Sequence, residues 1–288
     1  MTPSRLIASR SLRRVGAMLS LAAALLGRGQ ADAQPAFDHN VPYGQDAANV
    51  LDVYHPASGA GHLVVFLHGG GWVGGDKGAG RLIAAPLTRA GYVVASLNYR
   101  LAPQTTPMGA VQDAAQGISY LLHNAARFGI IPDRFAIIGH SSGAHMVALL
   151  GTDGSYLQRA GADPTKLAAV ITLDGVFDVQ ANLTDYPNSL RTGLFGNDSA
   201  AWRQVSPVDL LDTTRIHPRF CLVHEDRNRR FVEQEALFET ALKRHGEALS
   251  TVTANGLTHG QLVGQFGDPE APMASFTLAC LGQALGPR

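Results

Sequence analysis

Short apolar runs alternate along the chain with longer segments whose apolar residues follow a helical repeat. Two of the runs, at residues 49–54 and 249–254, alternate between apolar and polar positions as half-buried strands do. In residues 110–128 and around Leu237 and Leu242, apolar side chains recur close to every 3.6 positions, which predicts helices. We expect strands at residues 49–54, 63–67, 92–97, 135–138, 168–173, 220–223 and 249–254. Strands that alternate with helices indicate an α/β fold, a mostly parallel, doubly wound sheet with helices on both faces.

The first 33 residues do not follow this pattern. Four arginines, at positions 5, 10, 13 and 14, precede an uncharged apolar run at residues 15–26, and Ala31-Asp32-Ala33 follows. A basic start, a short apolar run and a small-x-small site are typical of a cleavable secretory signal. The apolar run is too short to span a bilayer of about 30 Å. We therefore expect a signal peptide at residues 1–33, exported by the general or the twin-arginine route, and a single domain at residues 34–288.

One region inside that domain has no clear periodicity. Residues 181–207 include Tyr186-Pro187, Phe195-Gly196 and Trp202, and no helix or strand repeat is evident there. Long irregular segments of compact domains are often lids or binding loops. We expect residues 181–207 to form such a lid or loop, or else a plain surface excursion.

Composition narrows the classes of function. The chain has 288 residues, of which 45% are hydrophobic and 16% charged, enough apolar material for a large core. Basic and acidic residues number 23 each, and residues 1–33 hold five Arg and one Asp, so the remainder is slightly acidic. A nucleic-acid-binding protein with a basic field is therefore excluded. Two cysteines cannot form a disulfide framework, and we expect Cys221 and Cys280 to be free buried thiols.

A pentapeptide with catalytic potential lies where a predicted strand meets a predicted helix. In Gly139-His140-Ser141-Ser142-Gly143, small residues flank a central serine. They leave room for a sharp turn that lifts the Ser141 hydroxyl above the edge of the sheet. The N–H groups at the start of the following helix, that of Ser142 among them, can bind a developing oxyanion. Ser141 is therefore a candidate nucleophile, and the alternative is a serine that only caps the helix.

A glycine-rich segment follows a second strand. Seven of the twelve residues from Gly69 to Gly80 are glycine, beginning with His68-Gly69-Gly70-Gly71-Trp72. Successive glycines present backbone N–H groups without side chains in the way, which suits an oxyanion hole. Gly70 and Gly71 are the candidate donors, together with Ser142. We expect His68 to be structural, and Trp72 and Trp202 to be candidate substrate-binding residues, with burial in the core as the alternative for Trp72.

A serine nucleophile needs a base that accepts its proton. His259, in Gly256-Leu257-Thr258-His259-Gly260, lies just past the last predicted strand and before the terminal helix. This position and the order of Ser141 before His259 favour a catalytic role. We expect the other ten histidines to be structural or exposed; His140 and His145 are too close to Ser141 in sequence to approach it from across a site.

Together these motifs resemble the esterase/lipase branch of the α/β-hydrolase superfamily, which includes hormone-sensitive-lipase-like bacterial esterases. The similarity covers most of residues 41–285. It includes Val41-Pro42-Tyr43-Gly44, Leu51-Asp52-Val53-Tyr54 and Asn98-Tyr99-Arg100-Leu101-Ala102-Pro103, in the order found in the family. The resemblance implies a sheet of about eight strands, a Ser–His–acid triad, an oxyanion hole near Gly70, Gly71 and Ser142, and neither a metal nor another cofactor.

The acid of the implied triad departs from the family pattern. Its usual place, after the seventh strand, is occupied by Asn228, which carries no negative charge. Asp226 is the nearest replacement, and Asp174, at the end of the preceding strand, is its rival. Both fit the chain order Ser…Asp…His. We prefer Asp226 and keep Asp174 as the alternative.

The expected function is therefore that of a secreted or periplasmic serine esterase. It would hydrolyse small-molecule carboxylic esters through an acyl-enzyme, without a nucleic-acid partner and without a stable membrane anchor after signal cleavage. Enzymes of the kynurenine formamidase type share these motifs, so amide hydrolysis is one alternative. A non-catalytic binding module on the same fold is another.

Overall fold

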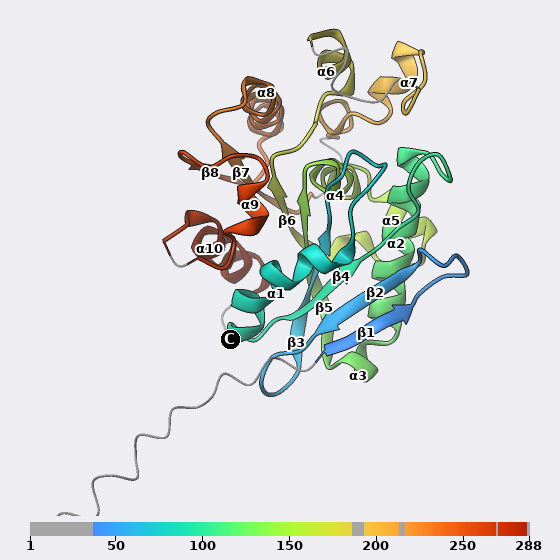
Figure 1. Ribbon diagram of the computed structural model, residues 1–288, viewed down its shortest axis with the longest axis vertical. Helices are drawn as coiled ribbons and strands as arrows, with labels where there is room; N and C mark the ends of the chain where they lie inside the picture. Colours follow the sequence, from blue (N-terminus) through green and yellow to red (C-terminus); the bar gives the residue numbers. More distant parts are fainter. Residues whose placement is uncertain (1–36, 186–192, 213–216, 269, 287–288) are drawn as a thin grey trace, which may run out of the picture. The chain divides into compact units, whose positions relative to one another are not determined.

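A central eight-stranded sheet organises the protein (Figure 1). The computed structural model describes residues 37–185, 193–212, 217–268 and 270–286, so the predicted signal peptide at residues 1–33 lies outside the described residues. The strands are β1 (Phe37–Pro42), β2 (Val50–Tyr54), β3 (Gly61–Leu67), β4 (Val93–Leu97), β5 (Ile130–His140), β6 (Leu167–Leu173), β7 (Arg219–Glu225) and β8 (Leu249–Ala254). Their order in the sheet is β1-β2-β4-β3-β5-β6-β7-β8, antiparallel at β1–β2 and β2–β4 and parallel from β4 to β8.

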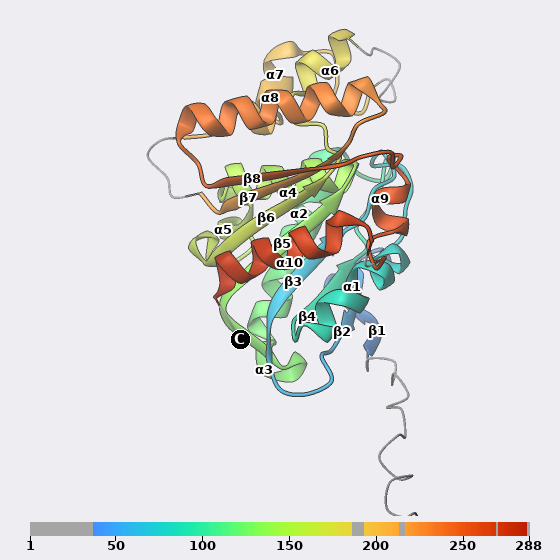
Figure 2. The same ribbon diagram turned by 90° about the vertical axis from the view of Figure 1, so that its left-hand side faces the viewer.

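Helices cover both faces of the sheet (Figure 2). The longer helices are α1 (Gly80–Arg89), α2 (Pro107–His123), α4 (Ser142–Thr152), α8 (Arg229–His245) and α10 (Pro272–Leu285). The shorter ones are η1 (Lys77–Ala79), α3 (Ala125–Phe128), α5 (Ser155–Arg159), η2 (Pro164–Lys166), α6 (Val179–Asp185), α7 (Ser199–Arg203), η3 (Pro207–Asp209) and α9 (Gln261–Gly264). Helices α2, α4 and α8 pack on one face, and α1 and α10 pack on the other.

The residues of β3 show why helices cover both faces of this sheet. Val65 points into the apolar cluster beneath α2 and α4, whereas its neighbours Val64 and Phe66 point into the cluster beneath α1 and α10. All three are completely buried. Successive side chains of a strand point to opposite faces, so a strand that is apolar at every position must be buried on both sides. The expected doubly wound α/β fold is confirmed.

The register of the parallel strands aligns their carboxyl ends. Leu67 of β3 lies opposite Gly139 of β5, and His140 of β5 lies opposite Leu173 of β6. The N–H of Ser141 donates to the carbonyl of Leu173 at 2.9 Å, and the N–H of Asp174 donates to that of Val223 at 3.0 Å. The loops that follow β3, β5 and β6 therefore begin side by side at one edge of the sheet.

Several element boundaries differ from those expected. The helix expected at residues 110–128 is interrupted at Asn124 and becomes α2 and α3. The edge strand β1 was not expected, because most of its residues are exposed and its sequence carries little apolar signal. Residues 181–207 contain the end of α6 and all of α7, whereas residues 186–192 lie outside the described residues.

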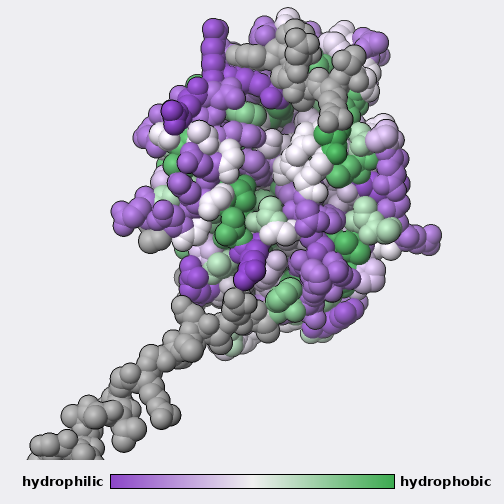
Figure 3. Space-filling view, viewed as in Figure 1, coloured by the Kyte–Doolittle hydropathy of each residue, from purple (hydrophilic) through white to green (hydrophobic). Residues whose placement is uncertain are grey.

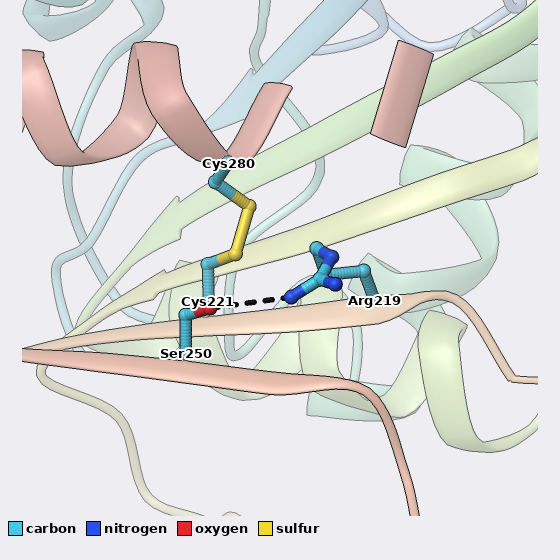
Figure 4. The surroundings of a disulfide bond; sticks show 4 residues. All are labelled: Arg219, Cys221, Ser250 and Cys280. Carbon is cyan, nitrogen blue, oxygen red and sulfur yellow. Dashed lines mark hydrogen bonds between the residues drawn. A yellow bond between two sulfur atoms is a disulfide. The ribbon is translucent and has the colours of Figure 1, made fainter. Parts of the chain in front are cut away.

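The two cysteines form a disulfide, which contradicts the expectation of free thiols. Cys221 lies in β7 and Cys280 in α10, with their Cα atoms 6.5 Å apart (Figure 4). Both side chains are buried. The pairing follows from α10 crossing the face of the sheet beside β6, β7 and β8, a contact between segments distant in sequence that strand and helix periodicity do not reveal.

On the face seen in Figure 3, hydrophilic residues predominate and hydrophobic residues form small groups among them. Among the described residues, none of the helices has the length and apolar character needed to cross a membrane.

Candidate active site

Ser141 lies on a sharp, strained turn, as the glycines on either side of it predict. Ser141 lies between β5 and α4 with φ 57° and ψ −118°, a conformation that non-glycine residues rarely adopt. A side chain on Gly139 would collide with the carbonyl of Gly143, and one on Gly143 would collide with the carbonyl of Leu67. Only glycine therefore allows strand β5, helix α4 and the end of β3 to meet this closely. Backbone strain of this kind persists where the surrounding structure enforces it and is frequent at active sites.

His259 is paired with Asp174. The Nδ1 atom of His259, in the loop between β8 and α9, lies 3.0 Å from Oδ2 of Asp174. Asp174 is completely buried, has a positive φ of 51°, and accepts the N–H of Glu225 at Oδ1 over 2.9 Å. A carboxylate accepts the Nδ1 hydrogen, which leaves Nε2 of His259 as the basic nitrogen. The ring of Phe231 stacks on the imidazole with centroids 4.0 Å apart and fixes its plane.

The preference for Asp226 as the partner of His259 is therefore contradicted. Asp226 is exposed at the end of β7, and its Oδ1 accepts the N–H of Gly256 at 2.9 Å, at the start of the His259 loop. Asn228 caps helix α8 by accepting the N–H of Arg230. Asp174 reaches His259 because β6 lies between β5 and β7, which places its carboxyl end beside Ser141.

His140 has a role that its sequence position did not suggest. Its Nε2–H donates to the backbone carbonyl of His259 at 2.9 Å, and the two imidazole centroids lie 4.5 Å apart. Burial, reinforced by the nearby His259, lowers the pKa of His140 to about 3. His140 is therefore neutral at physiological pH and does not compete with His259 for a proton. Its place directly before Ser141 was the available signal, because a residue at the end of β5 faces the loops from neighbouring strands.

The glycine-rich loop, Ser141 and His259 line one cavity. Ser141, His259, Gly70 and Gly71 all line a cavity of about 340 Å³. Gly70 has φ 129° and Gly71 has φ 61°, and a side chain on Gly70 would collide with the carbonyl of Gly74. Ser142 begins α4, so its N–H is one of the first amides of a helix, which have no acceptor within the helix. Gly70 and Gly71 thus line the cavity together with Ser141, and Ser142 follows Ser141 at the start of α4.

Tyr99 and His68, which are both buried, hold the start of the glycine-rich loop in place. The Tyr99 hydroxyl donates to the backbone carbonyl of His68 at 2.6 Å, and their rings stack with centroids 4.4 Å apart. Burial lowers the pKa of His68, which keeps this ring neutral. His68 is structural, as expected, and Tyr99 was an unassigned part of the motif at residues 98–103.

The two tryptophans lie outside the lining of the cavity around Ser141. Trp72 is 2% exposed and packs edge-on against His145 and Phe195. Trp202, in α7, donates its indole N–H to the carbonyls of Phe195 and Gly196. Neither indole lines the cavity around Ser141. Their placement therefore gives no support to the predicted substrate contacts, and for Trp72 it agrees with the alternative of burial in the core.

A second carboxyl group is buried behind Asp174. Glu235 of α8 is 3% exposed, and neither of its carboxyl oxygens has hydrogen-bond geometry to a partner. Burial, together with the charge of Asp174, raises the pKa of Glu235 well above its usual range, while the nearby amide of Gly175 opposes the shift. The raised pKa favours the neutral acid at Glu235.

The arrangement can activate a hydroxyl. It combines a serine on a strained turn, a histidine oriented by a buried carboxylate, and backbone amides around one cavity. These are the parts that acyl transfer to and from serine requires. Among the described residues, no group of three or more His, Cys, Asp or Glu side chains is placed to hold a metal ion.

Comparison with known proteins gives relatives named as hydrolases. The chain is 30% identical over 245 residues to a probable isoprenylcysteine alpha-carbonyl methylesterase of Oryza sativa subsp. japonica, a match that covers 77% of this chain and 57% of the relative. It therefore spans little more than half the length of that protein. It is also 25% identical over 252 residues to a kynurenine formamidase of Danio rerio, covering 85% of this chain and 82% of the relative.

Solved structures agree with the fold. Esterase B from Lactobacillus rhamnosis, in complex with a tributyrin phosphonate inhibitor, superimposes with a TM-score of 0.70 at 21% identity. The superposition covers 87% of this chain and 85% of that one. The BD-FAE family model matches residues 51–242, a range that includes the glycine-rich loop, Ser141 and Asp174. The chain therefore belongs to the BD-FAE family, within the α/β-hydrolase superfamily.

Proposed function

We propose that this protein is a serine esterase that hydrolyses carboxylic esters, with Ser141 as nucleophile, His259 as general base and Asp174 as the orienting acid. The observation that carries the proposal is the 3.0 Å contact between His259 Nδ1 and Asp174 Oδ2, on a histidine that lines the same cavity as the strained Ser141. The esterase named among its relatives supports the ester as substrate class.

The proposed reaction assigns a step to each of these groups. Nε2 of His259 takes the hydroxyl proton of Ser141 while Oγ attacks the acyl carbon. Asp174 holds the tautomer and stabilises the imidazolium that forms. The N–H groups of Gly70, Gly71 and Ser142 bind the oxyanion of the tetrahedral intermediate, an interaction worth about 2.7–4 kcal/mol per donor. His259 then protonates the leaving alcohol, and water releases the acyl group by the same steps in reverse.

Hydrolysis of p-nitrophenyl butyrate tests this proposal. The purified chain should show turnover, and Ser141→Ala should lose it by several orders of magnitude. Ser142→Ala is the matched control, because it keeps the backbone N–H that the oxyanion requires. Equal activity of Ser141→Ala and the wild-type chain would refute the assignment of the nucleophile.

Amide hydrolysis is the second candidate. The similarity to a kynurenine formamidase over 85% of this chain favours it, because acyl transfer from an aryl formamide uses the same nucleophile and base. Parallel measurements of kcat/KM for phenyl formate and formanilide decide between them. The ester proposal predicts that phenyl formate is preferred by more than its greater chemical reactivity explains, and the reverse order would favour the amidase.

We further propose that the chain acts outside the cytoplasm after cleavage behind Ala33. The sequence of residues 1–33 supports export. The Cys221–Cys280 disulfide supports it independently, since disulfides persist mainly in oxidising compartments. Expression of the full chain in a Gram-negative host, followed by fractionation and N-terminal sequencing, should find the protein in the periplasm with Gln34 at its start. Uncleaved protein in the cytoplasm would contradict the proposal.

A further inference from the structure

A carboxylate lies in the wall of the catalytic cavity. Asp76 follows the glycine-rich loop and lines the cavity that contains Ser141 and His259. Its Oδ1 atom accepts the N–H of Gly78 at 2.7 Å and thereby caps η1, while Oδ2 accepts the side-chain N–H of Asn98 at 2.8 Å. Two hydrogen bonds to different segments fix the carboxylate in one orientation. Each oxygen keeps a further lone pair for a ligand.

The charge of Asp76 is not neutralised within the cavity. The neighbouring Lys77 turns away, and its ammonium group lies 2.8 Å from Asp52 in a buried pair. Among the described residues that line the cavity, no Lys or Arg accompanies Asp76. The hydrogen bond from Asn98 lowers the pKa of Asp76, and burial lowers those of His68 and His140, the other two imidazoles of the wall. At neutral pH the wall therefore carries a fixed negative charge.

Asp76 and His259 line the same cavity, so the alcohol part of an ester can approach both residues. His259 gives its proton to the leaving alcohol, so the alcohol must lie beside that ring. His259 is followed by α9, and Asp76 is followed by η1 and α1. Helices α1 and α9 pack against each other, and Val263 of α9 and Ala79 of η1 line the cavity between them. The segments that follow Asp76 and His259 therefore bound one part of the cavity, and the leaving alcohol would lie there.

We propose that Asp76 makes this enzyme selective for esters whose alcohol part carries a positive charge. The selectivity rests on the proposed esterase function and deepens it by naming a substrate class. A cationic alcohol gains the attraction of the carboxylate as it enters, and a neutral alcohol of the same shape does not. The expected preference is about fivefold or more, the effect of a single charge pair at contact distance in water-like surroundings.

Butyrylcholine and 3,3-dimethylbutyl butyrate provide the test, because their alcohol parts have nearly the same shape and differ in charge. The ratio of their kcat/KM values, divided by the ratio of their rates of uncatalysed alkaline hydrolysis, should favour butyrylcholine about fivefold or more in the wild-type chain and approach one in Asp76→Asn. Asp163→Asn is the matched control. Asp163 caps η2 through the N–H of Thr165 as Asp76 caps η1, and it does not line the cavity, so its variant should keep the wild-type ratio.

The dependence of this ratio on ionic strength is a second test of the role of Asp76, and it needs no substitution. Salt screens exposed charges, so the wild-type ratio should fall as the salt concentration rises from about 0.02 to 0.5 M, whereas a preference based on shape would not change. If Asp76→Asn folds poorly, Asp76→Ser takes its place, because serine keeps a capping side chain at this position. The ratio should approach one in this variant too. A wild-type ratio near one, or a preference that survives in both variants, would overturn the role of Asp76. Absence of turnover with both esters and with p-nitrophenyl butyrate would instead refute the esterase function itself.

Discussion

Asp174 and His259 meet across the end of β7, 3.0 Å apart, although 85 residues separate them in sequence. Strand β6, which ends just before Asp174, directly neighbours β5, which ends just before Ser141. The proposed acid, base and nucleophile therefore lie in the segments that follow β6, β8 and β5, while the end of β7 supplies Glu225, whose N–H donates to Asp174. This arrangement explains how the chain can have Asn228 at the family's usual acid position.

Exchange of each rival aspartate for asparagine separates the two assignments. Asp174→Asn removes the charge that orients His259 and should lower kcat by about 10³–10⁴-fold, the scale expected when a triad acid is neutralised. Asp226→Asn removes only a carboxylate bonded to the Gly256 amide and should lower kcat less than about tenfold. Steady-state hydrolysis of p-nitrophenyl butyrate measures both. A larger loss in Asp226→Asn than in Asp174→Asn would reverse the assignment.

His140 is predicted to act as a positioning residue. His140→Phe keeps an aromatic ring against His259 but removes the N–H that holds the His259 carbonyl. Loss of a partner for this partly buried acceptor costs up to about 1–3 kcal/mol, so kcat should fall by up to about a hundredfold if the displaced loop moves His259. KM should change less than kcat, because the glycine-rich loop is retained and a phenyl ring takes the place of the imidazole in the cavity wall. His140→Gln, which restores an N–H, should recover part of the loss; equal activity of His140→Phe and wild type would show that the hydrogen bond is dispensable.

Glu235 should make stability depend on pH. Its pKa is raised in the folded protein by burial and by Asp174, so the folded state holds a proton that the unfolded state releases above its own pKa near 4.5. The stability contributed by the neutral acid is present below pH 4.5 and is lost as the pH rises towards the folded pKa. Glu235→Gln, which is neutral at every pH, should therefore be increasingly more stable than wild type as the pH rises above 4.5.

Urea unfolding between pH 4.5 and pH 9 measures this difference. Glu239→Gln is the control on the same helix, because the Glu239 side chain is partly exposed and pairs with Lys243 on the surface. Its effect should be small and should not grow with pH as that of Glu235→Gln does. A Glu235→Gln curve parallel to that of wild type would show that Glu235 is ionised in the folded protein.

The disulfide between β7 and α10 should contribute measurably to stability. It closes a segment of 59 residues in the unfolded chain, which corresponds to about 2–4 kcal/mol. The Cys221→Ser, Cys280→Ser double variant should have a lower unfolding midpoint than the oxidised wild type. The wild type in dithiothreitol should also lose stability, which separates the effect of the bond from that of two buried hydroxyls. Equal midpoints for oxidised and reduced wild type would show that the bond does not stabilise the fold.

The sequence was most informative where function depends on local backbone geometry. The Ser141 turn and the glycines at 69–71 were identified because sharp turns and close approaches require small residues within a few positions. The partner of His259 was harder to predict, since Asp174 and Asp226 both follow strands and only the order of strands in the sheet separates them. The Cys221–Cys280 bond and the His140–His259 contact have the same cause: each joins segments that the chain brings together only through packing.

Mapping of a fluorophosphonate adduct tests the central claim most directly, because only an activated serine reacts with this probe. The full chain should be labelled at one site, and peptide mass spectrometry should place the adduct on Ser141. Labelling should disappear in Ser141→Ala and slow markedly in His259→Ala, while Ser142→Ala still reacts. An adduct on another serine, or an unlabelled wild-type chain that is folded, would contradict the assignment of Ser141 as an activated nucleophile.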